Sequence, residues 1–383
     1  MKKSIPVISS IIFCIIIFTS CSNSLHDKYT TGLIVYKEFD KSRIFDTTSN
    51  SKSPAYYRPV KIDMFYPSIE KTGKAALTYG DILDMYEQRM NYNTSIDSCK
   101  KVSATLAKIF GDYLHADSSK ILAYKTAIFK DIRVPEKKLP LIIYAAGMNG
   151  SSWENPILFD SLTKAGYVVA AISSVGKFPG FMSGAVDLDE QVEDILFAKQ
   201  KMAALPFIDT SKIGLLSWSL GGSAISKAAM ISKDFKCLLS FDGTEIHYYG
   251  FDTAWDNEYN VMKLIPPFNP ASINIPYLYL SSEHPKKIDS IYILPAHIIS
   301  PDKYFLQFKN GTHEDFSSLI TIGKNVTPGL GNIDSSRHQV VCGLTLTFFN
   351  QYLKQSNTVT TADYINKLVA GKPGFYSTSY PEK

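Results

Sequence analysis

The stretch Ser217-Trp218-Ser219-Leu220-Gly221-Gly222 decides the fold. Residues 213–216 before it are apolar and predict a short buried strand, and residues 223–230 after it predict a helix. A strand, a small-x-Ser-x-Gly turn and a helix are typical of a nucleophile elbow, in which a sharp turn presents the serine above the sheet edge. Such a turn tolerates only small neighbours two positions away. Gly221 fits, and Ser217 stands where glycine is usual. The alternative interpretation is a glycine-rich turn with an incidental serine.

Length and composition indicate a globular chain without a nucleic-acid partner. The 383 residues are 45% hydrophobic and 20% charged, which is enough to bury a large core. The net charge is only +4, and no run of Lys and Arg forms a basic stripe. No Cys/His pair has zinc spacing, so we expect no metal and no other cofactor.

The N-terminus predicts export. Lys2 and Lys3 precede an apolar run over residues 5–18, which is typical of a secretory signal and too short for a comfortable membrane span. It ends in Phe18-Thr19-Ser20-Cys21, which resembles a bacterial lipobox with Phe18 where Leu is usual. We expect a signal peptide over residues 1–20, an acylated Cys21 and a tether over 21–30. This would anchor the protein to a membrane of the bacterial cell envelope, on the outer-membrane or periplasmic side. The alternative is an ordinary cleaved signal with a chance cysteine.

The remaining residues, 31–383, predict one α/β domain. Alternation over residues 31–67 predicts antiparallel strands. Helical spacing over 78–126 predicts one or two inserted helices, which either cap a pocket or simply pack on the sheet. From residue 139 onward, unbroken apolar segments alternate with helical ones. This predicts a mostly parallel sheet covered by helices on both faces.

A nucleophilic serine needs a histidine to take its proton and an acid to hold the imidazole. In this architecture the order is Ser, acid, His, on loops that follow the strands. His313 follows the last predicted strand, whereas His338 begins a long helix, where a helix-surface or interface role is more ordinary. Asp242 and Glu283 both follow strands between Ser219 and His313, and spacing alone does not separate them.

An ester hydrolase also needs an oxyanion hole, meaning backbone N–H groups that bind the negative oxygen formed during reaction. One donor would be the N–H of Leu220, directly after the serine. The second would be the N–H of Met148 in the loop Ala146-Gly147-Met148-Asn149-Gly150, where glycines allow close approach.

Four segments together resemble the α/β-hydrolase superfamily, and more narrowly the plasma-type platelet-activating-factor acetylhydrolases and dienelactone-hydrolase-like bacterial esterases. They are residues 58–67 (RPVKIDMFYP), 139–148 (LPLIIYAAGM), 209–214 (DTSKIG) leading to Ser219, and 310–316 (NGTHEDF). Ala146 replaces the His that is usual in the family. The resemblance covers residues 58 to about 350 and implies an α/β-hydrolase fold. The helical insert before the oxyanion strand is not well matched by it and is predicted from the helical spacing over 78–126. The resemblance also implies that the acid ends the strand after the elbow, which favours Asp242 over Glu283.

These features predict a serine carboxylic-ester hydrolase, acetylhydrolase-like, with Ser219, Asp242 and His313 as catalytic residues. We expect short-acyl or small lipid and glycan esters as substrates. The alternative is a non-catalytic, surface-anchored ligand-binding protein on the same fold. A prolyl-type peptidase is disfavoured because the chain before Leu139 is too short for a β-propeller.

Overall fold

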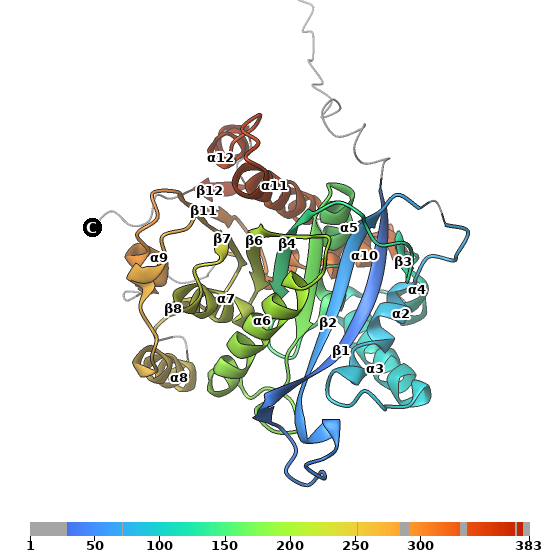
Figure 1. Cartoon of the computed structure of the whole chain (residues 1–383). Coiled ribbons are helices and arrows are strands. Elements are labelled where there is room, and N and C mark those ends of the chain that lie inside the picture. Colours follow the sequence, from blue (N-terminus) through green and yellow to red (C-terminus); the bar gives the residue numbers. More distant parts are fainter. Residues whose placement is uncertain are drawn as a thin grey trace, which may run out of the picture.

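The computed structural model describes residues 29–70, 72–250, 252–283, 291–329, 335–371 and 374–377 (Figure 1). The predicted signal peptide and Cys21 lie outside the described residues.

A ten-stranded sheet forms the centre of the described chain, in the order β12-β11-β9-β7-β6-β4-β5-β2-β1-β3. The strands from β11 to β5 in this order run parallel, whereas β2 runs antiparallel to both β1 and β5, and β12 antiparallel to β11. The bounds are β1 Thr30–Ile44, β2 Tyr57–Ser68, β3 Ile128–Lys130, β4 Leu139–Ala145, β5 Val168–Ser173, β6 Ile208–Trp218, β7 Phe235–Phe241, β9 Tyr277–Ser281, β11 Lys303–Phe308 and β12 Phe375–Ser377. The predicted antiparallel start and parallel centre are therefore confirmed.

Helices cover both faces of the sheet because its central strands are apolar on both sides. Every residue of β4 and β5 is buried. Helices α6 (Leu188–Ala203) and α7 (Leu220–Ile231) pack on one face, and α5 (Pro156–Lys164) and α11 (Ser335–Lys354) on the other (Figure 1). Strands β4, β6, β7, β9 and β11 are parallel, so their carboxyl ends lie at the same edge of the sheet. The loops that follow these strands therefore meet at that edge.

The predicted insert forms a small helical layer with its own apolar cluster. It holds three helices rather than one or two: α2 (Tyr79–Asp84), α3 (Ile96–Leu114) and α4 (Ser118–Ala123). A capping box at Thr78 begins α2, and His115 in the left-handed conformation ends α3. The short turn η2 (Glu87–Arg89) joins α2 to α3.

Several elements were not anticipated from the sequence. They are α8 (Thr253–Leu264), α9 (Leu294–His297), α10 (Ser318–Val326), and the two-stranded sheet of β8 (Ile246–Tyr248) and β10 (Ile291–Ile293). The strands are too short for a periodic signal, and α8 exposes apolar side chains such as Trp255 and Leu264, which blurs its pattern.

The position of His338 differs from the surface role that the sequence predicts. The residue lies on α11 but is buried rather than on the surface, and burial lowers the pKa of its imidazole to about 4. Within the ranges that the structure covers, we find no helix with the length and apolar character to cross a bilayer.

Candidate active site

Ser219 occupies the sharp turn between β6 and α7. Its φ of 56° and ψ of −126° are strained for a residue with a side chain. A Cβ on Gly221 would collide with the carbonyl oxygen of Ala145, so glycine is required where α7 passes the end of β4. Ser217, which stands where glycine is usual, is buried in β6, and its hydroxyl donates to Ser240 Oγ (3.3 Å). The local geometry is that of a nucleophile elbow.

His313 and Asp242 are hydrogen-bonded. His313 Nδ1 lies 2.7 Å from Asp242 Oδ2, although the two residues are 71 positions apart in the chain. Asp242 directly follows β7 in a left-handed conformation and is nearly buried. The backbone N–H of Ser282 (2.9 Å) and its hydroxyl (2.7 Å) donate to the same carboxylate. A carboxylate held in this way orients the imidazole and fixes its tautomer.

Trp218 joins the histidine to the elbow. Its ring stacks on the imidazole of His313 at a centroid separation of 4.8 Å, and its indole N–H donates to the carbonyl oxygen of His313 (3.2 Å). Among the described residues, Ser219 Oγ makes no hydrogen bond to the imidazole. Such bonds are often long in the unliganded state and shorten when substrate binds.

Glu283, the alternative acid, bonds the backbone of the loop just before His313. Its carboxylate accepts from the backbone N–H of Asn310, and its own N–H donates to the carbonyl of Gly311 (3.1 Å). Glu283 therefore ties the loop after β9 to the loop that carries His313. The geometry pairs the histidine with Asp242.

The loop after β4 forms a tight turn beside Ser219. Gly150 N–H donates to the carbonyl of Gly147 (2.9 Å), and Asn149 between them has a φ of 59°. A Cβ on Gly147 would lie 3.3 Å from Ser219 Cβ, so the loop and the elbow are in close proximity. Met148 stands at the tip of this turn with 51% of its surface exposed.

Glu154 supports that turn from beneath. Its buried carboxyl group accepts from the N–H of Gly147 (3.1 Å) and from the hydroxyl of Tyr144 (2.6 Å). A Cβ on Gly150 would collide with the same carboxyl. Burial raises the pKa of Glu154 to about 8.

Glu245 has a similar position beneath the elbow. It is buried, and a Cβ on either Gly222 or Gly243 would collide with its Oε2. The hydroxyl of Tyr277 donates to Oε1 (2.8 Å), and burial raises the pKa of Glu245 to about 7. Sequence reasoning missed Glu154, Glu245 and Ser282, since nothing in their local sequence distinguishes them from ordinary loop residues.

The helical insert contacts two of these loops. Tyr86 donates its hydroxyl to the carbonyl of Asn149 (2.7 Å), and Tyr113 donates to Glu314, next to His313 (3.1 Å). The insert therefore adjoins the candidate site rather than only covering the sheet.

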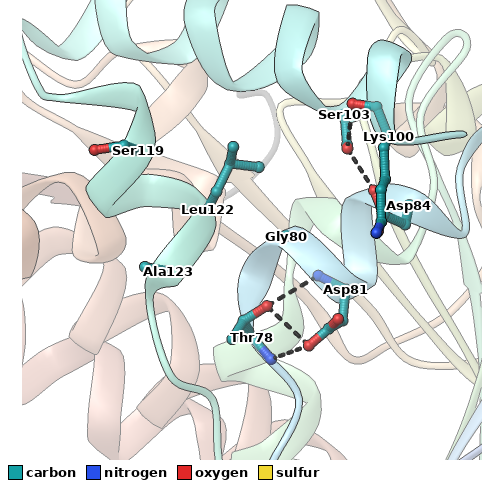
Figure 2. Close-up of a pocket in the computed structure, with 9 residues that line it drawn as sticks. All are labelled: Thr78, Gly80, Asp81, Asp84, Lys100, Ser103, Ser119, Leu122 and Ala123. Atoms are coloured by element: carbon teal, nitrogen blue, oxygen red, sulfur yellow. Dashed lines mark hydrogen bonds between the residues drawn. The ribbon is translucent and has the colours of Figure 1, made fainter. Parts of the chain in front are cut away.

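A pocket of about 440 Å³ lies within the insert itself (Figure 2). It is lined by Thr78, Gly80, Asp81, Asp84, Lys100, Ser103, Ser119, Leu122 and Ala123. None of the candidate catalytic residues contributes to it. In the part of the chain that the structure covers, no group of three or more His, Cys, Asp or Glu side chains is placed to hold a metal ion.

Comparison with known proteins identifies the fold. The ferulic acid esterase of Streptomyces cinnamoneus superposes with a TM-score of 0.61 over 92% of this chain and 96% of that chain, at 16% sequence identity. This chain has the α/β-hydrolase fold. The acylaminoacyl peptidase of Pyrococcus horikoshii overlaps less closely, with a TM-score of 0.43 over 57% of this chain and 38% of that chain, at 20% identity. No protein-family model and no curated protein sequence matches the chain.

The comparison confirms the predicted fold class and the resemblance to the α/β-hydrolase superfamily at the level of fold. The strand order β1-β2-β5-β4-β6-β7-β9-β11 supports it independently, with the elbow on the central strand β6. The narrower likeness to acetylhydrolases stays a prediction.

Proposed function

We propose that the protein is a serine ester hydrolase. Ser219 is the nucleophile, His313 the general base and then acid, and Asp242 the residue that orients the imidazole. The observation that carries the proposal is the 2.7 Å hydrogen bond between His313 and Asp242, on loops that lie beside the strained Ser219. The same fold in an esterase is consistent with it.

The proposed reaction has two halves. Ser219 Oγ attacks the ester carbonyl carbon while the imidazole takes its proton, and the carbonyl oxygen becomes an oxyanion bound by the N–H groups of Met148 and Leu220. The imidazolium then gives its proton to the departing alcohol, which leaves an acyl group on Ser219. Water, deprotonated by the same imidazole, attacks this acyl-enzyme and releases the carboxylic acid, which regenerates the serine. No step requires a cofactor.

The proposed substrates are esters with short acyl groups, or small lipid and glycan esters. The rate of the reaction should depend on the loop that carries Met148, because the loss of one oxyanion-hole donor typically lowers the rate by a factor of about 100 or more.

A fluorophosphonate probe tests the proposal. The full chain in detergent is labelled and the adduct is located by peptide mass mapping. We expect one adduct on Ser219, absent in Ser219→Ala and strongly reduced in His313→Ala. The matched control is Ser232→Ala, which removes a serine at the other end of α7. Folded protein that stays unlabelled would overturn the hydrolase proposal and leave the alternative, a ligand-binding protein without catalysis.

We also propose that Cys21 carries the lipid anchor, and this rests on the sequence alone. Bacteria expressing the chain are fed an alkyne-bearing fatty acid. Label that enters the wild type but not Cys21→Ala supports the anchor at the cell envelope. Label that persists in the variant contradicts it.

A further inference from the structure

Arg89, in the insert, is a buried cation that forms no ion pair within the described residues. Burial lowers the pKa of Arg89 and outweighs the nearby Glu87 carboxylate, which favours the charged form and so raises that pKa. The side chain is fully buried, and only Nη1 has a hydrogen bond, to the carbonyl of Tyr86 at 3.2 Å. Nε and Nη2 have no partner among the described residues. An unpaired buried charge is costly, so its retention points to a missing anion.

Asp63, the partner of the Lys61 side chain that Arg89 influences, is already engaged. Asp63 on β2 is buried and accepts from Lys61 Nζ (2.6 Å) and from the Ser152 hydroxyl. Burial lowers the pKa of Lys61, and the Arg89 guanidinium is close enough to lower it further. Asp63 therefore already accepts hydrogen bonds from one cation and one hydroxyl. Among the described residues it forms no ion pair with Arg89.

The free nitrogens have the geometry that carboxylates use. Nε and Nη2 form one edge of the guanidinium fork, and that edge donates two parallel hydrogen bonds to a carboxylate. The guanidinium carbon lies 3.7 Å from the centroid of the Tyr86 ring and 5.1 Å from that of the Phe181 ring. Phe181 has 62% of its surface exposed, so little packing holds it in place.

Both aromatic residues belong to segments that bind Asn149. Tyr86 donates to the Asn149 carbonyl, and the Asn149 side chain bonds the backbone of Met182 twice, at 2.7 and 3.0 Å. Since Asn149 follows Met148, Arg89 adjoins the loop of the candidate oxyanion hole.

We propose that Arg89, which lies against Tyr86 and Phe181 beside the oxyanion loop, binds a carboxylate carried by the ester substrate. In this proposal the Phe181 side chain changes rotamer so that the carboxylate can reach the guanidinium. The inference rests on the proposed hydrolase function and narrows its substrates to esters of anionic acids or anionic alcohols.

Two matched substrate pairs test this inference. Mono-4-nitrophenyl succinate carries the charge on the acyl side, and 4-nitrophenyl levulinate is its neutral isostere. For the alcohol side, 4-acetoxybenzoate is compared with its methyl ester. In at least one pair the wild type should prefer the anionic member, and Arg89→Met should lower that preference about 10- to 100-fold, mainly through KM. The ratio within a pair is independent of the folded fraction of the preparation.

The outcomes separate the two proposals. Arg89→Lys should restore part of the preference, because a lysine keeps the charge but not the fork. If Arg89→Met lowers both members of each pair equally, or if the wild type shows no preference, the inference is overturned, and the free nitrogens are better explained by buried water. If the fluorophosphonate probe fails to label Ser219, the hydrolase proposal fails instead. In that case, succinate that raises the Tm of the wild type but not of Arg89→Met would still support an anion site.

Discussion

At the scale of single residues, two buried glutamic acids support the candidate site from below. Glu154 accepts a hydrogen bond from the N–H of Gly147, and Glu245 occupies the space next to Gly222 and Gly243. Burial raises the pKa of Glu154 to about 8 and that of Glu245 to about 7, so Glu154 favours its protonated form at neutral pH and Glu245 does so below it. A neutral carboxyl group can support the turn without placing a negative charge beside a developing oxyanion.

Glu154 should act as a positioning residue. Glu154→Ala removes the acceptor under the turn, and we expect kcat to fall about 10- to 100-fold, as with the loss of an oxyanion donor. Glu154→Gln imitates the protonated acid and should stay within about threefold of the wild type at pH 7. Steady-state kinetics on a neutral ester provide the measurement. Equal losses in both variants would contradict the role.

Glu245 should make stability depend on pH. Its pKa rises from an ordinary value of 4.5 to about 7 in the folded state, so the folded protein binds its proton more tightly than the unfolded chain. The free energy of unfolding therefore loses up to about 1.4 kcal/mol per pH unit from this group as pH rises from 4.5 to 7. Buried His338, with its pKa lowered to about 4, acts in the opposite direction.

The Glu245→Gln variant isolates the glutamate from His338. Urea unfolding at pH 5, 6, 7 and 8 should show the wild type losing stability relative to this variant up to about pH 7 and no further. A difference that stays constant with pH would rule out the raised pKa.

At the scale of elements, the elbow depends on how closely β6 and α7 approach β4. The backbone of Gly221 lies against the Ala145 carbonyl, so no side chain fits between helix and strand. The strain at Ser219 is maintained because β4 and β7 pair with β6 on either side.

Gly221→Ala should therefore disturb both stability and activity. We expect a loss of about 1–3 kcal/mol in the free energy of unfolding, since the new methyl group meets backbone rather than a movable side chain. Gly73→Ala is the control, because a Cβ there meets nothing within 4 Å. Urea unfolding of both variants checks this, and an unaffected Gly221→Ala would show that the helix can shift freely.

At the scale of the whole molecule, the insert is attached to the candidate site at two loops. Tyr86 and Tyr113 reach the loops after β4 and β11, which are far apart in the sequence. Together with Phe181, the insert bounds the region where we place the carboxylate of the substrate.

Tyr86→Phe should impair both activity and stability. It removes the hydrogen bond to Asn149, and we expect about 1 kcal/mol of lost stability and a fall in kcat/KM of about three- to tenfold. Tyr92→Phe is a matched control, because Tyr92 is also in the insert and donates to a backbone carbonyl, that of Glu38, at 2.7 Å. Similar kinetic losses in both variants would show that the insert acts only through overall stability.

The sequence by itself determined the fold class, the elbow around Ser219, and His313 as the histidine after the last parallel strand, because periodicity and turn chemistry are local properties. It left Asp242 and Glu283 open by spacing, since both follow strands. Only the tertiary structure decided that Asp242 meets the imidazole while Glu283 binds Asn310. It alone placed Glu154, Glu245 and Arg89, because burial and missing partners depend on residues brought together from distant parts of the chain.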